Sequence, residues 1–580
     1  MMEKIRKEKI MIKTVLNSSI KLIVAVSLGL LLLQPVSLQA EIYPMPQKER
    51  DAYEALSPFE FKNILIETAT TACTEQLKTG KKCRVLNAGR GNPNFLNTTA
   101  REAFSLLNSF ATELAGKNGP APDLGFRPEK KGIAKKLENY LSEKCRGDAA
   151  EFLSKAIDYA EKELNLEPDE LVFELADAVL GDFYPSPPRM LTNTEKIVFD
   201  YLSLIHFSHD GRPKGKFDLF ATEGATAAMI YVFQSLKENH ILKPGDHIAI
   251  ITPIFSPYLE IPLLNDFQLV PVYVEGNEDM VWQVPASEMD KLKDTKIKAL
   301  FMVNPMNPGS ASMRAESVSR LAKIIKTSRK DLIVLTDTVY APFVDEFHDI
   351  LGIMPENTIG VYSYSKYFGV TGWRLGVIMI HENNIIDRML AKLPKKYKEQ
   401  LDARYGIDST EPETIKFIDR IVMDSRDVAL AHTGGLSTPQ QCIMALFSLF
   451  DLMDKEHAYK KSIQALLKKR ITNLYSQLNL KIPGGPDKTH YYALIDIGGL
   501  ASSLHGKEFA DYLMKNFSTF DILMRLADKK FTVLLPGEGF AGPKWSIRVS
   551  IANLNDDDYT SIGKNIREVM DDFFQSWEKK

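Results

Sequence analysis

The sequence predicts an α/β protein built around a large, mainly parallel sheet. Between residues 216 and 380, short apolar segments alternate with stretches of helical periodicity, the pattern of buried strands joined by helices. Polar and glycine-rich segments directly follow several of these strands, and ligands of open α/β sheets bind at that edge. The expected strands are Phe217–Ala221, His247–Thr252, Ala299–Val303, Leu332–Thr336, Thr358–Ser363 and Leu375–Ile380.

Helical sequence flanks the predicted sheet on both sides. A helical lead-in over 41–82 precedes a short strand and turn over 85–95, and charged amphipathic helices are expected over 126–181 and 395–431. At 580 residues the chain is long enough for two or three structural units. The last of these should be an α+β unit, with strands near Tyr491–Ile497, Phe531–Leu535 and Ser546–Ser550.

The first 40 residues are typical of an export signal. Basic residues up to Lys21 precede an apolar run from Leu22 to Leu33, which Gln34 and Pro35 break, and the small residue Ala40 stands at a possible cleavage point. This run is shorter than the roughly 20 residues that span a bilayer. We therefore expect a cleaved signal peptide over 1–40, a periplasmic location and no stable membrane span. An uncleaved anchor or a disordered tail is the alternative, and without export the protein would be cytoplasmic.

Charge and cysteine content bear on partners and compartment. A formal net charge of -3 gives no electrostatic case for nucleic-acid binding, although it allows local basic pockets for small acidic substrates. Cys73 and Cys83 flank a polar, glycine-containing stretch and could pair in an oxidising compartment. Two free thiols are an equally good interpretation. No group of Cys and His residues has the spacing of metal ligands, so no metal is expected.

The segment after the strand Thr358–Ser363 holds an unusually placed cation. Lys366 follows this apolar strand closely, and Arg374 comes eight residues later. A partly desolvated lysine has a neutral, nucleophilic amine, which Schiff-base chemistry requires. Ser363 and Arg374 could hold a phosphate group nearby. Taken alone, Lys366 would be interpreted as an ordinary surface residue.

Four further segments follow other strands, and each also has an ordinary structural interpretation. Asp337 could pair with a pyridinium nitrogen or simply cap a helix. Asn307 could bond a ring hydroxyl or belong only to a turn. Gly224–Thr226, at a helix start, could bind a phosphate, although this signal is weak alone. Phe255 could stack on a flat ring or be plain core.

In their order and spacing, these five segments resemble the fold-type-I pyridoxal phosphate (PLP) enzymes, the aspartate aminotransferase superfamily. The resemblance covers 86–95 and most of the chain from 182 onward. It implies a large PLP-binding domain over 182–434, with 395–431 as a helical insertion. It also implies an N-terminal arm and part of the small domain over 41–125, a helical insertion over 126–181, and a C-terminal small domain over 435–580. The site would be shared between subunits of a homo-oligomer, at least a dimer.

The resemblance also implies a role for each polar residue. Lys366 would carry the cofactor, Asp337 would pair with its ring nitrogen, and Phe255 would stack on the ring. Asn307 and Tyr340 would bond the ring hydroxyl. The residues expected at the phosphate are Gly224, Ala225, Thr226, Ser363 and Arg374.

The substrate carboxylate also has an expected partner. Arg548 matches the superfamily's arginine for the α-carboxylate, and a two-pronged guanidinium suits that group geometrically. One residue departs from the usual pattern, because Gly309 stands after Pro308 where the superfamily has Thr or Ser. With Asn307 retained, cofactor binding is still expected.

Residues 87–95 narrow the resemblance. Arg90 stands in a turn where ordinary members of the superfamily have no arginine, and together with 182–185 and 189–191 this turn resembles the aspartate 4-decarboxylases. The resemblance implies conversion of L-aspartate to L-alanine and CO2, with transamination to a 2-oxo acid as a side activity. Arg90 would face the substrate, unless it is only a solvated turn residue. Tyr184 would lie near the cofactor phosphate of a neighbouring subunit.

Two other functions are consistent with parts of the sequence. An aspartate or broad-range aminotransferase without decarboxylation would need the same cofactor residues. A PLP-binding transcription regulator would need a basic winged-helix segment before the cofactor domain. The sequence has a signal-like segment and acidic helices there instead, which argues against a regulator.

Overall fold

The computed structural model describes residues 41–117, 119–273 and 282–579, so the predicted signal peptide lies outside the described residues. The chain divides into two compact units. Of the smaller one, the described residues are 41–43 and 575–579, where the Ile42 backbone N–H donates to Ser576 Oγ at 2.9 Å. Apart from the last turn of the C-terminal helix, all further features belong to the larger unit, Pro44–Phe574. Over the described ranges, no helix has the length and apolar character needed to cross a membrane.

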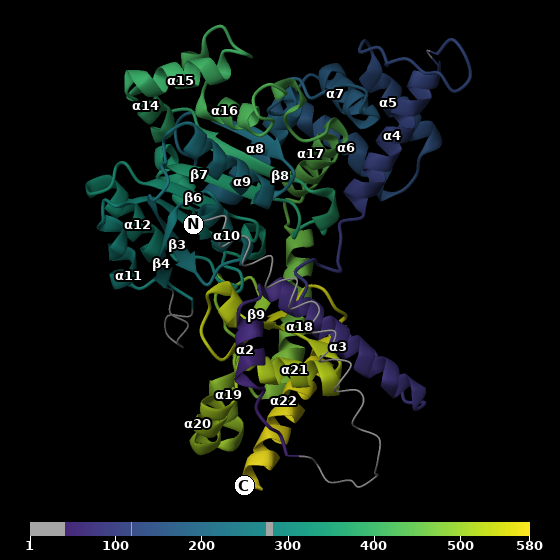
Figure 1. Ribbon diagram of the computed structural model, residues 1–580. Helices are drawn as coiled ribbons and strands as arrows, with labels where there is room; N and C mark the ends of the chain where they lie inside the picture. Colours follow the sequence, from purple (N-terminus) through teal and green to yellow (C-terminus); the bar gives the residue numbers. More distant parts are fainter. Residues whose placement is uncertain (1–40, 118, 274–281, 580) are drawn as a thin grey trace. The chain divides into compact units, whose positions relative to one another are not determined.

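The larger unit contains a seven-stranded sheet in the order β2-β8-β7-β6-β5-β3-β4 (Figure 1). Strand β8 runs antiparallel to both of its neighbours, and all other pairs are parallel. The predicted α/β class with a mainly parallel sheet is therefore confirmed. The strands are β2 (Phe217–Thr222), β3 (His247–Thr252), β4 (Gln268–Tyr273), β5 (Ile297–Val303), β6 (Ile333–Asp337), β7 (Thr358–Ser363) and β8 (Gly376–His381).

Strand β4 is the one member of this sheet that the sequence pattern did not predict. It contains Pro271 and is only partly buried, so it has neither an uninterrupted apolar run nor a clean alternation. It pairs only with β3, at the edge of the sheet. An edge strand tolerates a proline because one side of its backbone makes no ladder hydrogen bonds.

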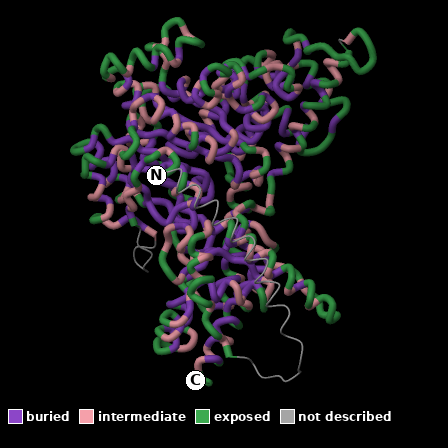
Figure 2. Tube along the Cα trace, viewed as in Figure 1, coloured by how far each residue is buried: buried purple, intermediate pink, exposed green. Residues whose placement is uncertain are grey.

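The sheet is buried because helices cover it. Apolar residues of β3, β5 and β6 pack with Leu321 and Ile325 of α12 in one core cluster. Strand β6 is buried at every position, which explains why its sequence is a nearly continuous apolar run. In Figure 2, most segments of this region are coloured as buried. The helices packed on the sheet are α8 (Thr192–Phe207), α9 (Ala225–Glu238), α10 (Pro257–Leu264), α11 (Ala286–Asp290), α12 (Ala315–Thr327) and α13 (Ile350–Ile353). Helix α17 (Thr438–Met453) packs in turn on α8.

Both predicted helical insertions are helical. The first contains α5 (Ile133–Lys144), α6 (Asp148–Leu164) and α7 (Pro168–Leu180). Helices α6 and α7 pack with α4 (Thr99–Lys117) and α17, and α5 packs with α7. The second contains α15 (Lys395–Tyr405) and α16 (Phe417–Asp424), after α14 (Ile385–Ala391). The exact domain boundaries stay a prediction.

A second group of short strands joins an N-terminal segment near residue 86 to the C-terminal part of the chain. Strand β1 (Leu86–Asn87) pairs with β10 (Thr532–Val533), and β12 (Ser546–Ser550) lies between β11 (Leu535–Pro536) and β9 (Tyr492–Asp496). The single strand predicted over 531–535 is thus two short strands with different partners. The helices of this part are α2 (Gln47–Glu54), α3 (Pro58–Lys78), α18 (Ala458–Leu478), α19 (Ile497–His505), α20 (Lys507–Asn516), α21 (Thr519–Lys530) and α22 (Asp556–Glu578).

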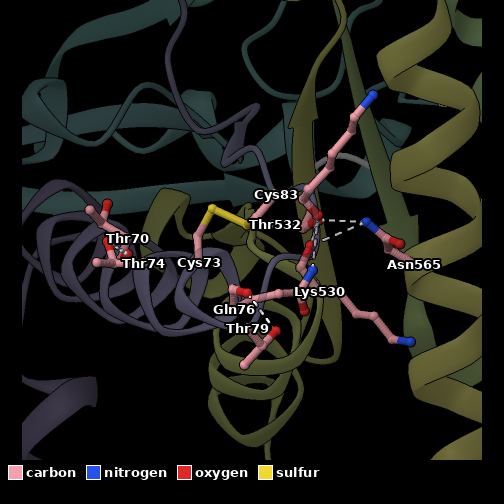
Figure 3. The surroundings of a disulfide bond; sticks show 10 residues. Thr70, Cys73, Thr74, Gln76, Thr79, Cys83, Lys530, Thr532 and Asn565 are labelled. Carbon is pink, nitrogen blue, oxygen red and sulfur yellow. Dashed lines mark hydrogen bonds between the residues drawn. A yellow bond between two sulfur atoms is a disulfide. The ribbon is translucent and has the colours of Figure 1, made fainter.

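A disulfide between Cys73 and Cys83 settles the question that the sequence left open (Figure 3). It joins the last turns of α3 to the segment that leads into β1. A cross-link at a separation of 10 residues is worth about 3 kcal/mol in the chain-entropy model. Next to it, Asn565 of α22 donates to Thr532 Oγ1 of β10 at 2.8 Å. The cross-link therefore fixes the chain just before the turn that carries Arg90. Cys145 and Cys442 are free and buried.

Candidate active site

A cavity of about 430 Å³ lies where β5, β6 and β7 end, a usual size for a small-molecule site. Residues from α3, the turn after β1, and strands β9 and β12 complete its wall. Most of the residues predicted to bind cofactor or substrate meet here. They are Arg90, Ala225, Thr226, Phe255, Asn307, Asp337, Tyr340, Ser363, Lys366, Arg374 and Arg548.

Lys366 follows β7 and reaches the cavity with a partly buried side chain. Its Nζ donates to the Gly91 carbonyl at 3.2 Å. Burial, helped by the positive charges of Arg548 and Arg374, lowers the pKa of Lys366 to about 8, against the opposing charge of Asp337. A substantial fraction of the amine is thus neutral, and nucleophilic, near physiological pH. The interpretation of Lys366 as a solvated surface residue is wrong.

Asp337 ends β6 and is almost fully buried. Its carboxylate accepts hydrogen bonds from Tyr258 Oη at 2.6 Å and from the Val339 backbone N–H at 3.0 Å. Burial raises the pKa of Asp337 to about 6, although these two hydrogen bonds and the Lys366 charge favour the ionised form. A buried carboxylate of this kind suits a cationic partner such as a protonated ring nitrogen.

The start of α9 and the segment after Lys366 supply groups for a phosphate. Gly224 precedes α9 with a φ of 91°, and a Cβ there would collide with the Arg374 guanidinium. Among the residues that the structure describes, no side chain caps this helix start, so its backbone N–H groups are available to an anion. Arg374 is held by the carbonyls of Glu223 and Thr371. Gly224 itself stands directly before the wall residues Ala225 and Thr226.

Arg548 is buried between two aromatic rings. Its Cζ lies 4.7 Å from the ring centroid of Tyr492 and 4.4 Å from that of Phe540. Nη1 donates to Asn307 Oδ1 at 3.3 Å and Nη2 to the Gly89 carbonyl at 3.0 Å. Burial lowers the pKa of this guanidinium. No ion pair joins Arg548 to a carboxylate over the described ranges, so a carboxylate ligand would supply its missing counter-charge.

Arg90 is exposed and contributes to the cavity wall. The carbonyls on either side of it are anchored: Gly89 accepts from Arg548, and Gly91 accepts from Lys366 and from Tyr491 Oη at 2.9 Å. The turn is therefore fixed, whereas no hydrogen bond or ion pair to another described residue holds the Arg90 side chain, which can reach a ligand.

Tyr184 lies outside the cavity of its own chain. It is 64% exposed, and its ring contacts His432 with the centroids 5.6 Å apart. The role expected for it in a neighbouring subunit stays a prediction.

Several wall residues were missed by the sequence reasoning. Tyr258 stands three positions after Phe255, and the helix start at Pro257 could have placed it on the same side. Tyr492 became identifiable only through the pairing of β9 with β12. Phe59 and Lys62 come from α3, and no local pattern connects that helix with the cavity.

The chemical groups of these residues match those of PLP. A nucleophilic lysine, a buried carboxylate and a phosphate cradle without room for a Cβ at Gly224 correspond to the aldehyde, the ring nitrogen and the phosphate of that cofactor. The fold and the site together define a PLP-dependent enzyme of fold type I.

The chain belongs to the family of class I and II aminotransferases, whose model matches residues 204–566. It is 43% identical, over 526 residues, to a bifunctional aspartate aminotransferase and L-aspartate beta-decarboxylase of Pseudomonas sp, covering 90% of this chain and 97% of that relative. An aspartate aminotransferase of Sulfurisphaera tokodaii is 26% identical over 377 residues, 63% of this chain and 78% of that one. The structure of Bna3p from Saccharomyces cerevisiae aligns over 91% of this chain and 99% of its own, with a TM-score of 0.55 and 16% identity, which supports the fold alone.

The lowered pKa of Lys366 predicts how cofactor capture depends on pH. Because the neutral amine attacks the PLP aldehyde, the rate should rise with pH and level off above about pH 8 rather than near the ordinary lysine value of 10.5. Stopped-flow absorbance of cofactor-free protein mixed with PLP measures this. Lys62→Met should keep the lysine-linked signal and Lys366→Ala should lose it. A rate still climbing at pH 10, or an unchanged signal in Lys366→Ala, would contradict the assignment.

Proposed function

We propose that this enzyme removes the β-carboxylate of L-aspartate to give L-alanine and CO2, with aspartate:2-oxoglutarate transamination as a side activity. The observation that carries the proposal is the presence of two arginines, Arg548 and Arg90, at the wall of one PLP cavity. Aspartate carries two carboxylates and needs two positive anchors. The printed name of the Pseudomonas relative, which aligns over nearly its whole length, supports the same reaction.

The described residues can perform the protein's part of this reaction. Arg548 binds the α-carboxylate, and its contacts with Asn307 and Gly89 fix the guanidinium plane. The Lys366 amine takes the proton from the substrate Cα, because its lowered pKa leaves it neutral often enough to act as a base. Bound PLP supplies an electron sink for that proton transfer and then for the bond to the β-carboxylate. In the overall reaction, one proton replaces CO2 at Cβ.

Arg90 is better suited to orienting the β-carboxylate than to gripping it. A tight ion pair would stabilise the carboxylate in the ground state and oppose loss of neutral CO2. The exposed position of Arg90, in contrast with the buried Arg548, provides a weaker and more mobile contact. We also expect a homo-oligomer, at least a dimer, in which the exposed Tyr184 reaches the cofactor phosphate of a neighbouring subunit.

Product analysis tests the proposed function. Purified protein with PLP and L-aspartate, but no 2-oxo acid, should release CO2 and alanine in equal amounts over many turnovers. An aminotransferase without decarboxylation would form at most one equivalent of oxaloacetate per site and stop, because its aminated cofactor needs a 2-oxo acid for regeneration. Lys366→Ala with added oxaloacetate measures the spontaneous CO2 background. Alanine limited to one equivalent would refute the decarboxylase.

The two arginines should have separable effects. Truncating one partner of a buried charge pair costs roughly 2–5 kcal/mol, so Arg548→Ala should lower kcat/KM about 30-fold or more for every amino acid tested. Arg90→Ala should affect dicarboxylic substrates alone and should lower the ratio of alanine to oxaloacetate. Arg146→Ala, in the first helical insertion, is the matched control and should change neither. Equal loss of decarboxylation and transamination in Arg90→Ala would reduce Arg90 to a binding residue. No loss of either activity would show that Arg90 is a solvated turn residue.

We further propose that the protein is exported to the periplasm. The signal-like segment over 1–40 and the Cys73–Cys83 disulfide support this, because disulfides persist in oxidising compartments. Protein isolated from its native cell should begin near Glu41, and thiol titration of the unfolded, unreduced chain should detect only Cys145 and Cys442. An intact Met1 or Met11, with every cysteine reactive, would contradict export.

A further inference from the structure

Tyr492 is a cavity residue to which neither the sequence pattern nor the comparisons assign a role. It begins β9, which pairs antiparallel with β12, and Leu494 of β9 stands opposite Arg548. Because side chains two residues apart on a strand share a face, Tyr492 and Arg548 are diagonal neighbours on the same face. This register brings the tyrosine ring to 4.7 Å from the Arg548 Cζ.

The contacts of Tyr492 complete a closed circle of four interacting side chains. Its Oη lies 2.9 Å from Tyr340 Oη. Asn307 Nδ2 donates to the same Tyr340 oxygen at 3.4 Å, and Asn307 Oδ1 accepts from Arg548 at 3.3 Å. Tyr492 therefore touches both the arginine expected to bind the substrate carboxylate and the tyrosine expected at the ring hydroxyl of the cofactor.

The hydrogen bonds of Tyr340 determine which groups donate and which accept in this circle of four side chains. A phenol oxygen has two acceptor positions and one proton. Asn307 occupies one acceptor position, and a donating Tyr492 would occupy the other. The Tyr340 proton would then be left for a ligand in the cavity. A phenol that accepts two hydrogen bonds is also a stronger donor, because hydrogen-bonded groups polarise one another.

The packing around the Tyr492 hydroxyl explains why a glycine follows Arg90. A Cβ on Gly91 would lie 2.6 Å from Tyr492 Oη, closer than real contacts allow. The carbonyl of the same glycine accepts from Lys366 and Tyr491. The turn that carries Arg90 is thus seated against Tyr492, so this tyrosine contacts both arginine sites of the cavity.

We propose that Tyr492 is a positioning residue that couples the substrate-carboxylate site to the cofactor site, its ring fixing Arg548 and its hydroxyl fixing the proton of Tyr340. The inference shares one assumption with the proposed function, namely that Arg548 binds a dicarboxylate. The two parts of the Tyr492 side chain have different roles. The aromatic ring affects the binding of the substrate carboxylate, and the hydroxyl affects the protonation of the cofactor.

Two substitutions of Tyr492 separate these contributions without any need for turnover. Tyr492→Phe removes the hydroxyl and keeps the ring, whereas Tyr492→Leu removes both. The first readout is the pH titration of the visible absorption of bound PLP. The second is the Kd of succinate, an unreactive dicarboxylate, measured by calorimetry on the PLP-loaded enzyme. Tyr475→Phe, which removes a buried phenol of α18 outside the cavity, is the matched control.

Tyr492→Phe should raise the titration midpoint by roughly half to one pH unit, the worth of one neutral hydrogen bond. The shift is upward because a weaker hydrogen bond from Tyr340 stabilises the anionic ring oxygen less, so the cofactor holds its proton to higher pH. Its succinate Kd should stay within about twofold of wild type. Tyr492→Leu should also weaken succinate about 2- to 30-fold, the range of a cation–π contact.

The inference fails if Tyr492→Phe titrates as wild type does, or if its shift is matched by Tyr475→Phe. It also fails if Tyr492→Leu is folded by circular dichroism and binds succinate with the wild-type Kd. Both readouts are independent of product formation. A protein that forms no alanine from aspartate but shows these shifts would refute the proposed function and leave the role of Tyr492 standing.

Discussion

The site depends on two cations, Lys366 and Arg548, that face one cavity without a carboxylate in ion-pair contact over the described ranges. Arg548 is among the largest fully buried side chains, and its charge is the largest electrostatic contribution, after burial, to the lowered pKa of Lys366. Burying a cation without a counter-ion is costly. The cost is offset where a ligand brings anionic groups, as PLP and an amino acid do. Burial, reinforced by this repulsion, lowers the pKa of the Lys366 amine and keeps it partly neutral, and therefore reactive.

The fold maintains this arrangement by joining distant parts of the chain. Asp337 ends the central strand β6 and Lys366 follows the central strand β7, whereas Arg548 belongs to β12. The turn with Arg90 binds to both sides, because its flanking carbonyls accept from Arg548 and Lys366. The Cys73–Cys83 disulfide fixes the chain that enters this turn. A change in any of these elements would alter the geometry of the others, so binding of cofactor and substrate should be coupled to overall stability.

Local patterns were sufficient for most of the sheet and for the cofactor residues. Buried parallel strands are continuous apolar runs, and the polar residues just after them, such as Asp337 and Lys366, meet at one edge for topological reasons. The edge strand β4 was not predicted, because Pro271 and its partial exposure interrupt the apolar pattern. Tyr492 and Lys62 could not be found locally, since strand register and helix packing decide where they point. The same holds for the Cys73–Cys83 pairing, which spacing alone left undecided.

The central claim is that Lys366, and no other lysine, attaches the cofactor to this chain. Reduction of the PLP-loaded enzyme with borohydride, followed by proteolysis and mass spectrometry of the peptides, tests it most directly. The account predicts one pyridoxyl group per chain, on the peptide that contains Lys366. A pyridoxyl group found instead on Lys62, the other lysine in the cavity wall, or no stoichiometric labelling of Lys366, would contradict it.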